Sequence, residues 1–223
     1  DNAKKTCLTL LAASALPTFA ALDIASVDIE GIKLGMKGEE AATLVKAYCE
    51  KTKNGKYEEQ PIVMDNINLS SLDCGKEEFG VLLLDSKTVA IFAAQKIDLN
   101  DTNDKDFINN WQLAVREKAV QKYGEPSLET NSAVIALYGE EIAPSQRLLC
   151  WGECDKTQAS EPTKNLFNVK NVLKVKGQGL FIGLNINGSK AVIIRTLVDE
   201  AATATQKNTS QTEAEKAAAK VNL

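Results

Sequence analysis

The chain has 223 residues, of which 44% are hydrophobic, and its net charge is −4. A chain of this size and composition can bury one good core or two small ones, and its slightly negative, scattered charge argues against a surface for nucleic acid. Histidine is absent, which excludes Ser-His-Asp and Cys-His catalytic sites and any zinc centre ligated by histidine.

The first twenty residues have the parts of a secretory signal peptide. Two lysines precede an apolar run over residues 7–16, and Pro17 and small residues follow it. The run is too short to span a bilayer, so we expect an export signal over residues 1–20, cleaved after Ala20. The alternative is a buried N-terminal helix. Export would place the protein in the periplasm or outside the cell.

An oxidising compartment decides how the cysteines are interpreted. Beyond the signal segment the chain contains Cys49, Cys74, Cys150 and Cys154. Three pairings are possible, and closeness in sequence favours Cys49–Cys74 and Cys150–Cys154. A four-cysteine zinc site and a redox pair are the alternatives. The wide first spacing does not suit a zinc knuckle, and the second lacks the Cys-x-x-Cys pattern, so we predict two structural disulfides and no metal site.

Residues 21–97 are predicted to form a first α+β half. A helix is expected over residues 37–51, because its apolar side chains recur at three- and four-residue spacings. These side chains are Ala41, Leu44, Val45, Tyr48 and Cys49. One strand is expected over residues 61–69. Residues 79–84 and 88–94 are predicted to form a hairpin around Asp85-Ser86-Lys87.

Oxygen-bearing side chains crowd residues 98–106, a pattern that a calcium loop or a polar linker could have. A calcium loop of the EF-hand type fails, because Asn103 stands where that loop requires glycine. The segment is therefore predicted to be a polar linker in which Asp104 or Asp106 caps the next helix.

Residues 107–200 are predicted to form a second half, and residues 201–223 a polar tail. A helix over residues 107–123 should end at Gly124. Strands are expected over residues 133–138, 147–151, 179–186 and 190–198, with Asn187-Gly188 as a type I′ hairpin turn. The tail has almost no hydrophobic side chains, so it should be disordered or a solvated helix.

This order of elements predicts an α+β fold. A helix followed by antiparallel meander strands would occur twice, with the helices covering one face of the sheet. Whether the halves form one sheet or two is left open.

One stretch carries a family resemblance. Residues 32–41, Ile-Lys-Leu-Gly-Met-Lys-Gly-Glu-Glu-Ala, resemble the Gly-Met helix opening of small exported α+β domains. The outer-membrane assembly lipoproteins of the SmpA/OmlA type and the secreted β-lactamase inhibitor proteins begin domains in this way. In the inhibitors a disulfide joins the end of this helix to the next strands, as Cys49 and Cys74 could do here. The resemblance implies a fold and a non-enzymatic role, and it transfers no functional residue.

The leading functional hypothesis is an exported, non-catalytic protein-interaction module, with a place in envelope assembly as one option. It would bind another envelope or secreted protein through the open face or edge of its sheet. Trp151 is the first candidate contact, followed by Tyr138 and Trp111, although burial in the core explains tryptophan equally well. No cofactor is expected.

Two other classes remain as alternatives. A secreted inhibitor or small-ligand binder would need a pocket lined by apolar groups with a few polar ones. An enzyme without histidine chemistry is the third class. Glu39/Glu40 and Glu140/Glu141 are adjacent in sequence, so their side chains should point in different directions. No catalytic residue is therefore predicted, and the oligomeric state is open.

Overall fold

The computed structural model describes residues 20–53, 55–76, 78–99, 104–159, 169–221. Nearly all of the predicted signal peptide lies outside these residues. The elements in chain order are η1 (Ile24–Ser26), α1 (Gly38–Thr52), β1 (Glu58–Met64), β2 (Ile67–Asp73), β3 (Phe79–Leu84), β4 (Lys87–Asp98), α2 (Lys105–Tyr123), β5 (Leu128–Leu137), β6 (Glu140–Gln158), β7 (Asn171–Asn187), β8 (Lys190–Asp199), η2 (Ala201–Thr203) and α3 (Ala204–Ala218).

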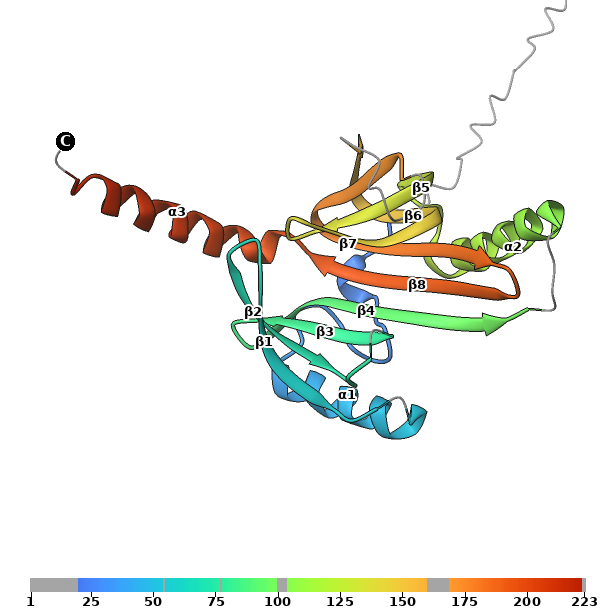
Figure 1. The fold of residues 1–223 in the computed structure, drawn as a ribbon, viewed down its shortest axis with the longest axis horizontal. Coiled ribbons are helices and arrows are strands. Elements are labelled where there is room, and N and C mark those ends of the chain that lie inside the picture. Colours follow the sequence, from blue (N-terminus) through green and yellow to red (C-terminus); the bar gives the residue numbers. More distant parts are fainter. Residues whose placement is uncertain (1–19, 54, 77, 100–103, 160–168, 222–223) are drawn as a thin grey trace, which may run out of the picture.

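All the strands belong to one eight-stranded sheet (Figure 1). Strands β1 to β4 form an antiparallel meander, and β8, the last strand of the chain, pairs with β4 from Ala90↔Val198 to Asp98↔Lys190. At the other end, β6 pairs with both β5 and β7, and β5 also pairs with β7 in parallel through residues 133–135. Each of these three strands therefore pairs with the other two, β5 and β7 only over this short stretch.

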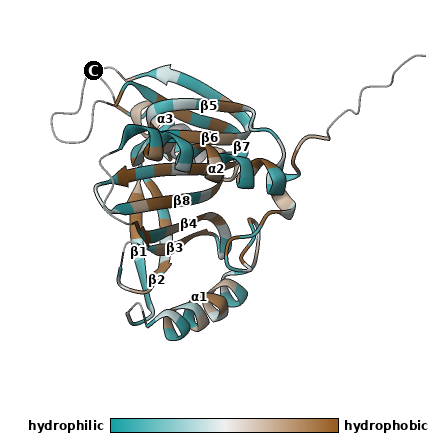
Figure 2. Ribbon diagram, turned by 90° about the vertical axis from the view of Figure 1, so that its right-hand side faces the viewer, coloured by the Kyte–Doolittle hydropathy of each residue, from teal (hydrophilic) through white to brown (hydrophobic). Residues whose placement is uncertain are grey.

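The predicted fold, two repeats of a helix and a meander, is wrong. The strands of the second half do not form a sheet of their own, because β8 joins the first four strands through β4. Strands β6 and β7 have 19 and 17 residues, much longer than the separate short strands expected there. The sheet thus dominates the molecule. Figure 2 shows that the central strands β4 and β8 are largely hydrophobic, as strands in the middle of such a sheet must be.

Helix α1 lies on the outer part of one sheet face, which we call the covered face. Its buried side chains Ala41, Val45 and Cys49 are four residues apart and belong to the same core cluster as residues of β2, β3 and β4. The Tyr48 ring stacks on Phe79 at a centroid distance of 4.1 Å. The helical periodicity in the sequence thus identified the packed side of α1.

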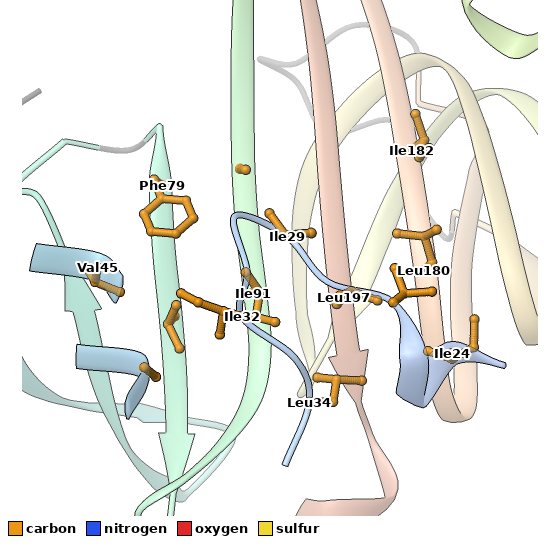
Figure 3. Packing of buried hydrophobic residues seen from close by; sticks show 14 of the residues in the cluster. Ile24, Ile29, Ile32, Leu34, Val45, Phe79, Ile91, Leu180, Ile182 and Leu197 are labelled. Atoms are coloured by element: carbon orange, nitrogen blue, oxygen red, sulfur yellow. The ribbon is translucent and has the colours of Figure 1, made fainter. Parts of the chain in front are cut away.

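An irregular segment, residues 24–34, covers the middle of the same face (Figure 3). Ile29 and Ile32 are fully buried and exchange two backbone hydrogen bonds of 3.0 Å around a tight turn. The turn residues Glu30 and Gly31 both have positive φ angles. Apart from the single helical turn η1 at its start, this segment carries large apolar side chains on an extended and turning backbone that covers the sheet here.

Helix α2 packs beside that segment on the covered face. Asp104 caps it by accepting a hydrogen bond from the Asp106 N–H at 2.9 Å, and Gly124 ends it with a φ of 80°. The end at Gly124 agrees with the sequence prediction, and Asp104 is one of the two caps that it named, although the helix begins at Lys105 and not at residue 107. Ala119 is buried in the core cluster, and Val115 and Tyr123 pack against it.

Two turns differ from the prediction. The single strand expected over residues 61–69 is interrupted by Asp65-Asn66, whose φ angles of 47° and 60° make a type I′ turn between β1 and β2. The last hairpin turns at Gly188-Ser189, because Asn187 pairs with Lys190. Only Gly188 has a positive φ there, which is the pattern of a type II′ turn and not the expected type I′.

The predicted disulfide pairing is confirmed. Cys49 and Cys74 join the end of α1 to the end of β2, with sulfur atoms 2.07 Å apart. Cys150 and Cys154 join two positions of β6, with sulfur atoms 2.00 Å apart.

In the part of the tail that is described, helix α3 extends away from the sheet (Figure 1). None of the described helices has the length and apolar character needed to cross a membrane.

Candidate binding cleft

Trp151 lies in the core and not on an exposed loop between the cysteines. It is a residue of strand β6 and its side chain is 1% exposed. Its indole N–H donates a 2.9 Å hydrogen bond to the Gly124 carbonyl, and its ring meets the Tyr123 ring edge-on at 5.8 Å. Trp151 therefore attaches the end of α2 to the sheet. Trp111, also in α2, packs against the same core cluster.

Tyr138 is also buried, with a side chain that is 0% exposed. It forms a type I′ turn with Gly139 between β5 and β6, with φ angles of 47° and 81°. Its hydroxyl lies 3.0 Å from the carbonyl oxygens of both Val89 and Asp199. Burial raises the pKa of this hydroxyl strongly, and the carboxylates of Glu200 and Asp199 add to the effect. Trp151 and Tyr138 are thus buried, and Trp111 packs against the core cluster, so the three predicted contact residues do not form one surface patch.

A cleft of about 430 Å³ lies on the sheet face opposite α1, which we call the open face. Leu82 of β3, Phe92 of β4 and Thr196 of β8 contribute to its lining, together with Ile142 and Ala143 of β6. Most of the lining is apolar, and Leu82, Phe92 and Ile142 are only partly buried. This is an accessible apolar surface on the sheet.

Two hairpins bound the cleft where their tips meet. The β1–β2 tip touches the β5–β6 tip so closely that a Cβ added at Gly139 would lie 3.0 Å from the Asp65 side chain. Ile67 and Leu69 of β2 share a buried cluster with Leu137 and Tyr138. The sheet is therefore curled over its open face at one end, which makes the face concave.

The strand register places five residues in one row across this face. Each pair in the row is directly opposite on neighbouring strands, and opposed side chains point to the same side of a sheet. The row runs Glu58, Asp73, Gly80, Phe92 and Thr196. We call it the transverse row. A second hollow of about 340 Å³ at its acidic end shares Ser71, Gly80 and Phe92 with the cleft, so the two hollows are adjacent.

The acidic end of the transverse row has two carboxylates on facing strands. Asp73 accepts hydrogen bonds from the Gly75 N–H at 2.7 Å and from the Ser71 hydroxyl at 3.0 Å. Glu58 is its direct partner across the strands. Like charges placed directly opposite each other destabilise a strand pair, so a cation at this position would relieve the repulsion. Lys76 is the one basic residue lining this hollow among the described residues.

The other end of the row has a buried hydroxyl without a partner. Thr196 is 1% exposed, and its Oγ1 atom has no hydrogen-bond partner among the described residues. A buried polar atom of this kind destabilises the folded protein by about 1–3 kcal/mol. Since Thr196 lines the cleft, a bound molecule could supply the missing partner.

Strand β1 is the outer edge of the sheet, and it is poorly suited to bind an added strand. Met64 and Ile67 flank a two-residue turn, so they form a hydrogen-bonded pair. Hydrogen-bonded and non-hydrogen-bonded pairs alternate along antiparallel strands, so position 61 is in a non-hydrogen-bonded pair and its backbone groups point away from β2. Position 61 is proline, which has no N–H. The edge therefore lacks a donor in its middle, and binding through the open face is better supported than binding through the edge.

Sequence reasoning missed the cleft, and no local signal identifies it. Gly80 and Phe92 face each other in the hairpin that the sequence predicts, but Thr196 is distant in the chain and joins them only through the pairing of β4 with β8. Among the described residues, no group of three or more acidic or cysteine side chains could hold a metal ion.

No family model matches this chain, and neither the curated proteins nor the solved structures contain a match.

Proposed function

We propose that the chain is an exported, non-catalytic binding protein that holds an apolar part of another envelope or secreted protein in its cleft. The observation that carries the proposal is the concave, apolar, accessible open face. Apolar side chains left in contact with water cost about 25 cal/mol per Å², so covering Leu82 and Phe92 would favour association. Concave sites with mostly apolar walls and a few polar groups are typical of binding sites.

The export part of the proposal depends on the cysteines and the N-terminal segment. Two disulfides are compatible with an oxidising compartment, where such bonds persist. A place in envelope assembly depends on the resemblance of residues 32–41 alone. It stays a prediction.

A small apolar ligand is the second candidate. A cleft of about 430 Å³ falls within the range of about 300–1,000 Å³ that ligand pockets occupy, and such pockets combine apolar walls with a few polar groups. The hydroxyls of Ser71 and Thr196 would be those groups. The open shape of the site favours the protein partner.

The test is affinity capture from an extract of exported proteins, using the wild type and two matched variants. Phe92→Glu places a charge in the cleft, whereas Val63→Glu places the same charge on β1, at a side chain that is already 67% exposed. We expect a partner to be captured by the wild type and by Val63→Glu and to be lost with Phe92→Glu. Circular dichroism checks that both variants are folded.

Two outcomes contradict the proposal. If Phe92→Glu, correctly folded, retains the partner, the cleft is not the interface. If Val63→Glu alone loses the partner, the edge strand is the binding element. A third outcome would favour the small apolar ligand. In that case the wild type, after extraction of lipids, captures no protein, and a small molecule is recovered from the native protein.

A further inference from the structure

The transverse row has the chemistry of a site for one kind of segment. We infer that the partner presents an extended segment in which apolar side chains are followed, on the same side, by a lysine or arginine. The segment would lie across the strands, with its backbone near Thr196 and its cationic end at Asp73 and Glu58. This inference rests on the proposed function and specifies the partner's chemistry.

The dimensions of the row fit a short peptide. Thr196 and Asp73 are three strands apart, through Phe92 and Gly80. Neighbouring strands are about 4.8 Å apart, so this part of the row is about 14 Å long. An extended peptide rises about 3.4 Å per residue, and its alternate side chains point the same way. A pentapeptide therefore places its first, third and fifth side chains along the row.

Each position of the row matches one part of such a segment. The unpartnered hydroxyl of Thr196 can bond a backbone N–H or C=O group of the segment, as buried hydroxyls usually do. The partly buried Phe92 ring offers apolar contact. The opposed carboxylates of Asp73 and Glu58 attract a cation, and they repel an acidic side chain.

Gly80 provides space in the middle of the row, and the fold does not require a glycine there. Its φ angle is not in the positive range, and a Cβ at this position would meet its nearest neighbours, Leu72 O and Asp73 Cβ, only at 3.8 and 3.9 Å. These are ordinary van der Waals distances. A glycine inside a strand weakens the strand and often marks a place where another backbone approaches closely. Here the approaching backbone would be that of the partner segment.

The experiment is an NMR titration of the full chain with two capped pentapeptides. Both have leucine at positions one and three and alanine at two and four, and they differ in lysine or glutamate at position five. We expect the lysine peptide to shift the amide resonances of Gly80, Phe92 and Thr196, and the glutamate peptide to bind at least about fivefold more weakly. Raising the salt concentration should reduce this difference.

Three variants test the parts of the row separately. Glu58→Gln should weaken the lysine peptide by about twofold to fivefold and leave the glutamate peptide no weaker. Thr196→Val should weaken both peptides. Gly80→Val fills the space beside the strand and should abolish the shifts of the amide resonances. If this variant does not fold, Gly80→Ala replaces it in the test and should weaken the binding of both peptides.

The inference is overturned if the two peptides bind equally, if neither peptide shifts the row, or if the shifts lie elsewhere. Its failure is distinguishable from failure of the proposed function. If the two peptides bind with equal affinity and Phe92→Glu still loses the captured partner, the preference for a cation is wrong, but the cleft remains the interface. A partner retained by Phe92→Glu would remove the proposed function itself.

Discussion

At the scale of single residues, the cleft has a measurable energetic signature at Thr196. Valine has nearly the same shape as threonine and removes the unpartnered hydroxyl. We therefore expect Thr196→Val to raise the free energy of unfolding by about 1 kcal/mol in urea denaturation. Binding would be weakened while stability increases, which is the pattern of a functional position.

Thr203 supplies the matched control for this prediction. It is also 1% exposed, but its hydroxyl donates a 2.9 Å hydrogen bond to the Glu200 carbonyl. Thr203→Val should lower the free energy of unfolding by about 1 kcal/mol. If both substitutions destabilise the protein equally, Thr196 has a partner in solution and the signature is absent.

Tyr138 predicts a dependence of stability on alkaline pH. At pH 8, Tyr138→Phe should lower the free energy of unfolding by about 1 kcal/mol, because the bond to Val89 or Asp199 is lost. Above the ordinary tyrosine pKa of about 10, the unfolded wild type ionises while the folded protein, whose pKa is raised, stays neutral. The unfolded state then binds fewer protons, so wild-type stability falls as pH rises.

The measurement is urea denaturation of both proteins between pH 8 and pH 11. Ionisation of this tyrosine in the unfolded state should lower the stability of the wild type by about 1.4 kcal/mol by pH 11, so the gap of about 1 kcal/mol between the two proteins should close below pH 11 and be slightly reversed there. Other groups titrate equally in both proteins and cancel in the difference. A gap that stays constant to pH 11 would show that the Tyr138 hydroxyl ionises at its ordinary pKa when folded.

At the scale of elements, the two disulfides should differ in their contributions. Cys49 and Cys74 are 25 residues apart, whereas Cys150 and Cys154 are only 4 apart. On the chain-entropy model, the first bridge should contribute about 3.5 kcal/mol and the second about 2 kcal/mol. Replacing each pair by alanine and measuring urea denaturation tests this order. A larger loss for the Cys150–Cys154 pair would show that its bridge acts by holding β6 locally.

At the scale of the whole molecule, contact between two hairpin tips keeps the sheet curled over its cleft. Gly139 and Gly35 are both turn residues with positive φ angles, of 81° and 79°, but only Gly139 has a close neighbour at its missing Cβ, the Asp65 side chain at 3.0 Å. Alanine at either position costs about 1 kcal/mol of backbone strain. Gly139→Ala must also push the tips apart, so it should destabilise the protein by more than Gly35→Ala does.

Thermal denaturation of the two alanine variants measures this difference. Gly139→Ala should also weaken binding in the cleft, since the Leu137 wall moves with the β5–β6 tip. Equal losses of stability in both variants would mean that the tips do not hold each other.

The sequence alone determined several local features of this protein, but not the Asp65-Asn66 turn or the type of the last hairpin turn. The helix caps at Asp104 and Gly124 and the packed side of α1 follow from spacing and backbone chemistry within a few residues. The disulfide pairs followed from closeness along the chain. Strand pairing is different, because β4 and β8 are nearly a hundred residues apart and hydrophobic runs pair equally well with several partners. The tertiary structure therefore decided that there is one sheet and not two repeated halves. It also buried Trp151 and Tyr138, and it placed Glu58, Gly80, Phe92 and Thr196 in one row, because register between distant strands is set by packing across the whole sheet.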